Sequence, residues 1–280
     1  MQNTTIELYS KDAFKHQEYQ LLRLIPKGLM DILVKNGVII AGGSVSSVFS
    51  GMPINDYDLY CPSSSAYNSL LKDFREYIKK TDLKGNALGA EVFITENAVT
   101  FRCDGKMYQV IQTHLRQESP VSRLTAEDII KEFDFTICMG AYNTVTHQFS
   151  LHNQFLEHIA RRVLMFNPDS KYPICALGRV KKYVKKGYHI SGAEIVKMAL
   201  CVANLEMKDY TDLKYQLLGI DTYIFADLTE DLIEKHGKDA KIDYGVVMEM
   251  IEYSLDKLND IEMVWQKQME SAEESGDVFE

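Results

Sequence analysis

The order of apolar and polar positions predicts alternating helices and strands at the start of the chain. Residues 11–35 have helical spacing, a pattern typical of a helix that is broken at Pro26 and ended by Gly37. Residues 38–41 form a short apolar run bounded by glycines, which has the length and composition of a buried strand. Residues 55–61 are expected to form a second strand.

The next segment adds a helix and a hairpin. A helix is expected from the serine-rich turn after Cys61 to about residue 80. Two strand-like runs, 98–103 and 107–113, are joined by Asp104-Gly105, a strong signal for a tight turn between antiparallel strands. Residues 133–142 fit either another strand or the start of a buried helix.

Capping patterns mark several helix ends. Thr125 with Asp128, and Ser191 with Glu194, have the spacing of the capping box that opens a helix. Gly187 is expected to end the helix before it.

Helical spacing dominates after about residue 150. In the helix at 173–186, three apolar residues form one stripe and three basic residues form another; these are Leu177, Val180 and Val184, and Arg179, Lys182 and Lys186. Further helices are expected over 195–206, 228–236 and 243–270. The acidic stretch 270–280 contains few apolar residues and is typical of a disordered tail. The expected organisation is therefore an α/β head over 1–150, a helical domain over 151–269, and a tail.

Composition narrows the class of protein. The 280 residues are 46% hydrophobic and 25% charged, as in ordinary soluble domains. The N-terminus lacks an apolar signal core and no run is long enough for a membrane helix. The five cysteines are scattered and form no metal-binding spacing. A protein of the cytoplasm, without membrane contact, is the expectation.

Charge is unevenly distributed. The net charge of −9 argues against general affinity for nucleic acid. Residues 161–186 nevertheless contain eight basic residues and one acidic residue. The basic face at 173–186, including Arg179, is either a solvated helix surface or a surface for phosphate or RNA.

The candidate chemistry lies in residues 42–59, which read GGSVSSVFSGMPINDYDL. Gly42 and Gly43 follow a strand and open a helix, where bare backbone N–H groups favour phosphate. Asp56 and Asp58, two positions apart on a strand, project from the same face. Carboxylates in that arrangement, together with substrate phosphates, can hold Mg²⁺.

This segment resembles the GGxVRDxLLGRxxxDxDL signature of bacterial-type tRNA CCA-adding enzymes and poly(A) polymerases. Residues 134–143, DFTICMGAYN, resemble the family's DFTINAMAYN, and residues 173–188 have the length and pattern of its DPLRILRAIRFAARLGF segment. The resemblance implies an α+β fold, that of a polymerase-β-like nucleotidyltransferase head with a mixed sheet, followed by an all-helical domain.

The resemblance also implies an activity. Asp56 and Asp58 would be catalytic and would hold two Mg²⁺ ions, while Gly42, Gly43 and Ser44 would hold the phosphates of a nucleoside triphosphate. Asp134 would either contact the ribose or anchor the fold, and Arg179 would meet phosphate. The reaction would transfer a nucleoside monophosphate to a hydroxyl, with an RNA 3′ end, for example of tRNA, as the acceptor.

Several positions depart from the family pattern. Serines at 46 and 47 replace an arginine and an aspartate, and Gln109 stands where relatives carry an acidic residue. Tyr172 and Cys175 replace the aspartate and arginine that pair with the incoming base. Two alternatives therefore stay open: a weak or inactive relative that binds nucleotide or RNA and regulates, and a toxin-like enzyme that modifies host RNA or protein.

Overall fold

The computed structural model describes residues 5–82, 92–94, 98–103, 106–111, 124–217, 232–238 and 240–249. Its strands are β1 (Ile6–Leu8), β2 (Ile39–Ala41), β3 (Asp56–Tyr60), β4 (Val92–Ile94), β5 (Ala98–Cys103), β6 (Lys106–Ile111), β7 (Gly140–Asn143), β8 (Gln148–His152), β9 (Val163–Leu164) and β10 (His189–Ile190). Its helices are α1 (Lys15–Leu22), α2 (Lys27–Lys35), α3 (Gly43–Ser50), α4 (Ser64–Asp82), α5 (Ala126–Lys131), the 3₁₀ turn η2 (Thr136–Cys138), α6 (Phe155–Arg161), α7 (Pro173–Lys185), α8 (Gly192–Ala203) and α9 (Tyr210–Leu217).

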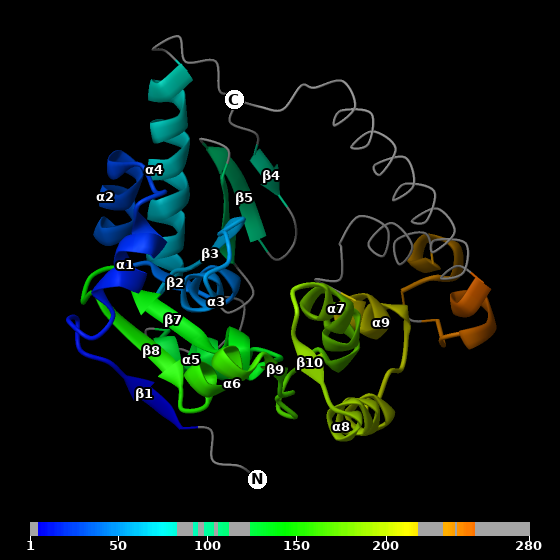
Figure 1. The fold of residues 1–280 in the computed structure, drawn as a ribbon. Coiled ribbons are helices and arrows are strands. Elements are labelled where there is room, and N and C mark those ends of the chain that lie inside the picture. The colour runs from blue at the N-terminus through cyan, green and yellow to red at the C-terminus, as the bar shows by residue number, and fades with distance from the viewer. Residues whose placement is uncertain are drawn as a thin grey trace, which may run out of the picture. The chain divides into compact units, whose positions relative to one another are not determined.

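Eight strands form one mixed sheet, in the order β1-β8-β7-β2-β3-β6-β5-β4 (Figure 1). The β3–β6 pair is parallel and the other neighbouring pairs are antiparallel. The expected α+β fold with a mixed sheet is confirmed. Strands β1, β4 and β8 were not expected. β1 pairs with β8, which is distant in the chain, whereas β4 and β8 pair with their neighbours in sequence, β5 and β7.

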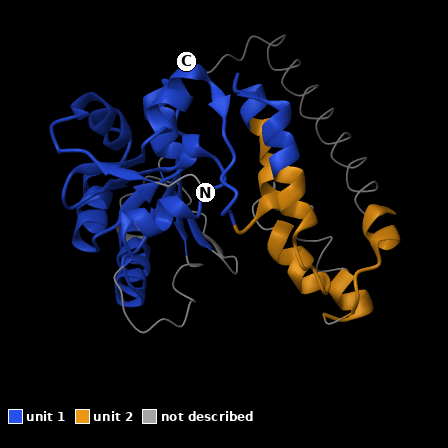
Figure 2. Ribbon diagram, turned by 90° about the horizontal axis from the view of Figure 1, so that it is seen from below, with its two compact units in different colours: residues 1–170, 183–197 blue, residues 171–182, 198–280 orange. Residues whose placement is uncertain are grey.

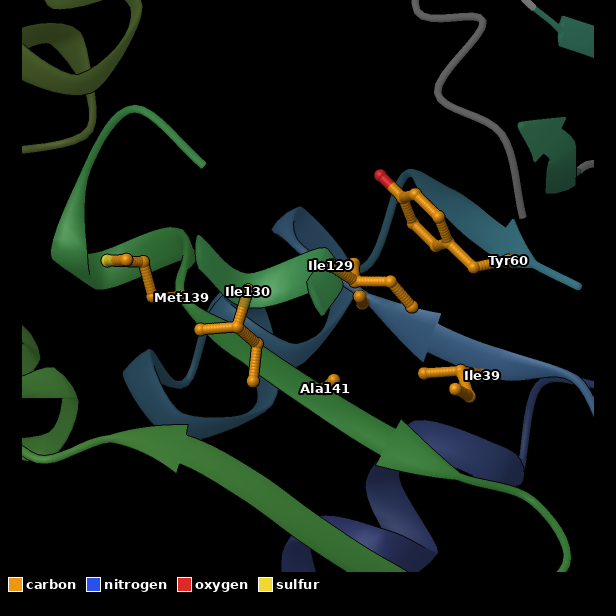
Figure 3. Packing of buried hydrophobic residues seen from close by; sticks show 7 residues of the cluster. Ile39, Tyr60, Ile129, Ile130, Met139 and Ala141 are labelled. Atoms are coloured by element: carbon orange, nitrogen blue, oxygen red, sulfur yellow. The ribbon is translucent and has the colours of Figure 1, made fainter. Parts of the chain in front are cut away.

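The sheet is covered on both faces. On one face, the hydroxyl of Tyr57 donates to the backbone oxygen of Leu21 in α1, at 2.9 Å. On the other face, Ile129 and Ile130 of α5 pack over the strands in a cluster of seven buried residues, Ile39, Ala41, Tyr60, Ile129, Ile130, Met139 and Ala141 (Figure 3). Tyr60 and Asp58 lie two positions apart on β3, so the Asp58 side chain points to the α5 face.

The structure confirms two of the local features predicted from the sequence, a capping box and a hairpin. Thr125 and Asp128 form the expected capping box at the start of α5. The β5–β6 pair confirms the hairpin, although residues 104–105 of its turn lie outside the described residues. Residues 133–142 contain both the short turn η2 and strand β7 rather than one element.

The helix α7 corrects one expectation. Leu177 and Val184, expected on its packed face, are 38% and 48% exposed. The buried residues are Pro173, Cys175 and Ala176, while Tyr183 of the same helix packs edge-on against Phe135. Helix α7 carries apolar residues on more than one side. The side that packs depends on the neighbouring elements in the fold, and the spacing of apolar residues alone does not determine it.

The chain forms two compact units (Figure 2). The first comprises Met1–Ser170 with Tyr183–Lys197, and the second comprises Lys171–Lys182 with Met198–Glu280. The expected head boundary at residue 150 falls inside β8. Residues 232–236 and 244–249 are helical, whereas the rest of the expected helix at 243–270 and the acidic tail at 270–280 lie outside the described residues.

Candidate functional site: the turn from β2 to α3 and the face of β3

Gly42 connects β2 to α3 in a backbone conformation that favours glycine. Its φ is 75° and its ψ is −130°, a region that side chains bearing a β-carbon rarely adopt. Its N–H donates to the carbonyl of Gly140 in β7, at 3.0 Å. A β-carbon at this position would lie 3.3 Å from Oδ2 of Asp58 and 3.3 Å from the ring of Phe133. The backbone at Gly42 therefore lies directly against the Asp58 carboxylate.

Gly43 is the first residue of α3 and has open space beside it. A β-carbon there would meet no atom of the described residues within 4 Å. No side chain caps the helix, and its first intrahelical bond runs from the Ser46 N–H to the Gly42 carbonyl. The N–H groups before Ser46 thus have no partner within the helix, which fits a phosphate group.

The Ser44 side chain is directed toward the backbone. It is buried, and its Oγ lies 3.5 Å from the carbonyl of Ala41 at the end of β2. This contact gives Ser44 a place in the turn itself. Its expected role toward phosphate remains a prediction.

Asp56 and Asp58 lie on one face of β3, both half-buried. Asp58 is paired with Ala41 of β2 on one side and with Gln109 of β6 on the other. The two aspartate Cα atoms are ~7 Å apart along the strand. Two carboxylates on one face offer the oxygen ligands that Mg²⁺ prefers, so the residues fit a divalent cation.

The neighbour of these carboxylates on β6 is an amide. Gln109 contributes no negative charge beside Asp58. Across the described ranges, no three His, Cys, Asp or Glu residues gather closely enough to hold a metal ion. Any cation at this site would therefore rely on Asp56 and Asp58 for its protein carboxylates within those ranges.

Asp134 follows Phe133, whose ring would lie 3.3 Å from a β-carbon at residue 42. Its side chain is buried, and its carbonyl accepts from the Asn167 N–H at 2.8 Å. The side-chain amide of Asn167 donates to the backbone carbonyls of Lys131 and Phe133, both at 2.9 Å. This network holds the Phe133 segment in place beside Gly42. Contact of Asp134 with ribose remains a prediction.

Arg179 belongs to the second compact unit, on α7. Its expected contact with phosphate is a prediction that the geometry of the first unit does not address. Phe133 was not expected beside Gly42. Arg102 was not expected on the strand face of Asp56, where the pairs Asp56–Met107 and Met107–Arg102 place it. The alternation of residues 98–103 contained a usable signal, since Arg102 is an exposed charge between two buried neighbours.

The thiol next to β3 is chemically inert. Cys61 follows Tyr60 directly and is buried, and burial raises the pKa of its thiol to about 12. A thiol with so high a pKa is not a nucleophile near neutral pH. The five cysteines are thiols and form no disulfide with one another.

The helices and the overall fold can be compared with those of known classes of protein. Every helix in the described ranges is too short or too polar to cross a bilayer. Among solved structures, the fold is similar to that of the Thermotoga maritima CCA-adding enzyme complexed with tRNA, with a TM-score of 0.50, 12% identity, and coverage of 81% of this chain and 54% of that one. The Bacillus stearothermophilus CCA-adding enzyme in complex with CTP has a TM-score of 0.43 and 17% identity. That alignment covers 79% of this chain and 52% of that one.

Sequence comparison identifies a family. The chain is 32% identical over 219 residues to "Gabija anti-defense 2" of Bacillus phage SPbetaL7, an alignment that covers 78% of this chain and 50% of that protein. The chain thus spans about half the length of this curated relative. Residues 1–162, more than half of the 280, match the family model described as "Gabija anti-defense 2 family protein". The chain belongs to the Gabija anti-defense 2 family.

Proposed function

We propose that this protein is a Mg²⁺-dependent nucleotidyltransferase that moves a nucleoside monophosphate from a triphosphate to an acceptor hydroxyl. The observation that carries the proposal is the closeness of Gly42 to the carboxylate of Asp58, since a β-carbon on residue 42 would lie 3.3 Å from Asp58 Oδ2. This closeness places the start of α3 beside the acidic face of β3.

The residues have separate tasks in this reaction. The backbone N–H groups at the start of α3 would hold phosphate oxygens in the space beside Gly43, and the carboxylates of Asp56 and Asp58 would hold Mg²⁺. When bound, Mg²⁺ would supply positive charge to the phosphates and favour ionisation of the acceptor hydroxyl. The acceptor oxygen forms a bond to the α-phosphorus, the bond from that phosphorus to the bridging oxygen breaks, pyrophosphate leaves, and the hydroxyl proton passes to solvent.

RNA is one candidate acceptor. The motifs in residues 42–59 and 134–143 resemble those of enzymes that extend RNA 3′ ends, and the similar Thermotoga maritima enzyme was solved with tRNA. The basic helix α7 would meet the RNA backbone, because phosphates attract clustered lysine and arginine side chains.

The family description favours a second acceptor. An anti-defense protein acts against a bacterial defence, in this case Gabija. The same transfer onto a protein or nucleic acid of that defence, in the cytoplasm of the infected cell, would link the chemistry to the family role. A member that only binds nucleotide is the remaining candidate, and the neutral Gln109 beside Asp58 favours it.

Labelled nucleotide transfer separates these acceptors. The purified protein would be incubated with Mg²⁺ and each α-³²P triphosphate, with total RNA or with lysate from cells that carry Gabija. We expect label in a macromolecule, together with released pyrophosphate. RNase sensitivity of the label would identify RNA as the acceptor, and protease sensitivity would identify protein.

A double variant, Asp56→Ala with Asp58→Ala, is the control for transfer. Binding of a triphosphate without label transfer to either preparation would reject the transferase and leave the nucleotide-binding regulator.

A further inference from the structure

The strands β3, β6 and β5 carry two chemically different faces. On one face the rings of Tyr57 and Tyr108 stack, with centroids 5.3 Å apart and planes 9° from parallel. The ring of Phe101 continues this face and contacts Phe74 of α4, at 4.8 Å between centroids. Since neighbouring residues in a strand point to opposite faces, the residues between these aromatics lie on the other face.

That other face carries Arg102 in line with Asp56. Asp56 is paired with Met107 of β6, and Met107 is paired with Arg102 of β5. Three adjacent strands therefore place Arg102 in the same row as Asp56, ~10 Å away from Cα to Cα. Arg102 is exposed, whereas Met107 is half-buried. The Arg102 side chain is long enough to reach over Met107 toward a ligand held at Asp56.

The next row contains the second aspartate and no further charge. Asp58 is paired with Gln109, and Gln109 is paired with Thr100. Along these rows, the face thus presents two carboxylates, one guanidinium and two neutral polar side chains. Gln109 can offer a carbonyl oxygen to a cation but no negative charge.

These charges favour one divalent cation over two. Mg²⁺ is held by one or two carboxylates together with substrate phosphates, so Asp56 and Asp58 supply the carboxylates for one ion. The neutral Gln109 beside Asp58 adds no carboxylate for a second ion. A guanidinium presents a planar set of donors that matches phosphate oxygens. Arg102 thereby supplies the phosphates with positive charge without a second metal.

We propose that this face binds a nucleoside triphosphate together with one divalent cation, and that Arg102 of β5 contacts its phosphates. The inference rests on the proposed function for the identity of the ligand, and it concerns metal number and phosphate contact rather than transfer. The site is then built differently from a two-cation site, because Arg102 takes over part of the neutralisation of phosphate charge.

Metal counting with Mn²⁺ tests the first part. The full chain would be titrated with Mn²⁺ at a saturating concentration of each nucleoside triphosphate, without acceptor, and free Mn²⁺ would be measured by electron paramagnetic resonance with a nucleotide-only blank. We expect one Mn²⁺ per chain beyond the blank in the wild type. The variant Gln109→Glu adds a carboxylate beside Asp58 and is expected to bind a second Mn²⁺.

Nucleotide affinity tests the second part. Arg102→Gln should weaken triphosphate binding about tenfold to a hundredfold, the loss expected for a charged hydrogen-bonded contact, and should leave binding of the unphosphorylated nucleoside unchanged. The matched control is Arg161→Gln, which removes an exposed arginine that pairs with Glu157 at 2.8 Å on α6. The control should bind like the wild type, and both variants should keep the wild-type circular dichroism spectrum.

The outcomes separate this inference from the proposed function. Two Mn²⁺ per wild-type chain, no triphosphate binding, or unchanged affinity in Arg102→Gln would overturn the inference. A wild type that binds one Mn²⁺ and the triphosphate but labels no acceptor would leave the inference standing and remove the transferase. A wild type that binds two Mn²⁺ and labels an acceptor would overturn the inference and leave the transferase standing.

Discussion

The backbone of Gly42 lies against the carboxylate of Asp58, so that a β-carbon on residue 42 would come within 3.3 Å of Asp58 Oδ2. This relationship joins the turn that opens α3 to the strand that carries both aspartates. It explains why the two glycines are not equivalent, since Gly43 has open space where Gly42 has none.

Gly42→Ala is expected to destabilise the protein by about 1–3 kcal/mol, because alanine is strained at a φ of 75° and its methyl group would crowd Asp58 and the Phe133 ring. Gly43→Ala is the matched control and should change stability by less than about 1 kcal/mol. Urea unfolding of both variants measures the difference. Equal stabilities would show that the turn relaxes without cost.

Gly43→Val is expected to weaken triphosphate binding while the protein stays folded. The side chain would occupy the space at the start of α3 that the phosphate needs. Strain in the turn belongs to Gly42, so lost affinity in this variant would report on the pocket alone. Isothermal titration with and without EDTA provides the measurement, and wild-type affinity under both conditions would exclude a metal-dependent phosphate site here.

Asp56→Ala and Asp58→Ala should each lower transfer at least a hundredfold, because each removes a charged ligand that stabilises the reacting phosphates. Both side chains are half-buried on a strand face, so circular dichroism should remain that of the wild type. Asp31→Ala on the exposed surface of α2 is the control. Mg²⁺-dependent transfer that survives in the double aspartate variant would disprove the catalytic assignment.

Stability should fall as the pH drops below about 6.5. Burial lowers the pKa of both His152 and His158 from 6.5, and Thr136 Oγ1 lies 2.7 Å from Nδ1 of His158. The unfolded chain then binds more protons than the folded chain over this range, so the free energy of unfolding decreases with falling pH. Melting temperatures at pH 7.5 and 5.5 measure the loss, and His158→Gln should reduce it; an identical loss in that variant would exclude His158 as a source.

Base selection should be loose, because Tyr172 and Cys175 cannot offer a base edge the donor and acceptor pattern of an arginine with an aspartate. Tyr172 donates its hydroxyl to that of Tyr215, at 2.9 Å, with the ring centroids 5.0 Å apart. Aromatic faces accept any base by stacking. Incorporation on a tRNA that lacks its CCA end should therefore proceed with more than one triphosphate. Ordered addition of C, C and then A would contradict this expectation.

The sequence by itself determined the local parts of this protein. The glycines at 42 and 43 marked the turn between β2 and α3, the alternation at Asp56 and Asp58 marked one strand face, and Thr125 with Asp128 marked the start of α5. Each of these features depends on residues close together in the chain, where backbone preference and side-chain spacing decide the outcome.

Only the tertiary structure decided which distant segments meet. The resemblance had already pointed to Gln109, and the sequence contained the alternation of Arg102. Only the order of the sheet, with β5 joined to β3 through β6, brought Arg102 onto the aspartate face. In the expected capping box, Ser191 accepts from the Glu194 N–H, yet the Glu194 carboxylate accepts from the distant N–H of Phe166 at 2.7 Å. The physical reason is that strand pairing and burial reward contacts between residues far apart in the chain, and the residue pattern of one segment does not specify its partner.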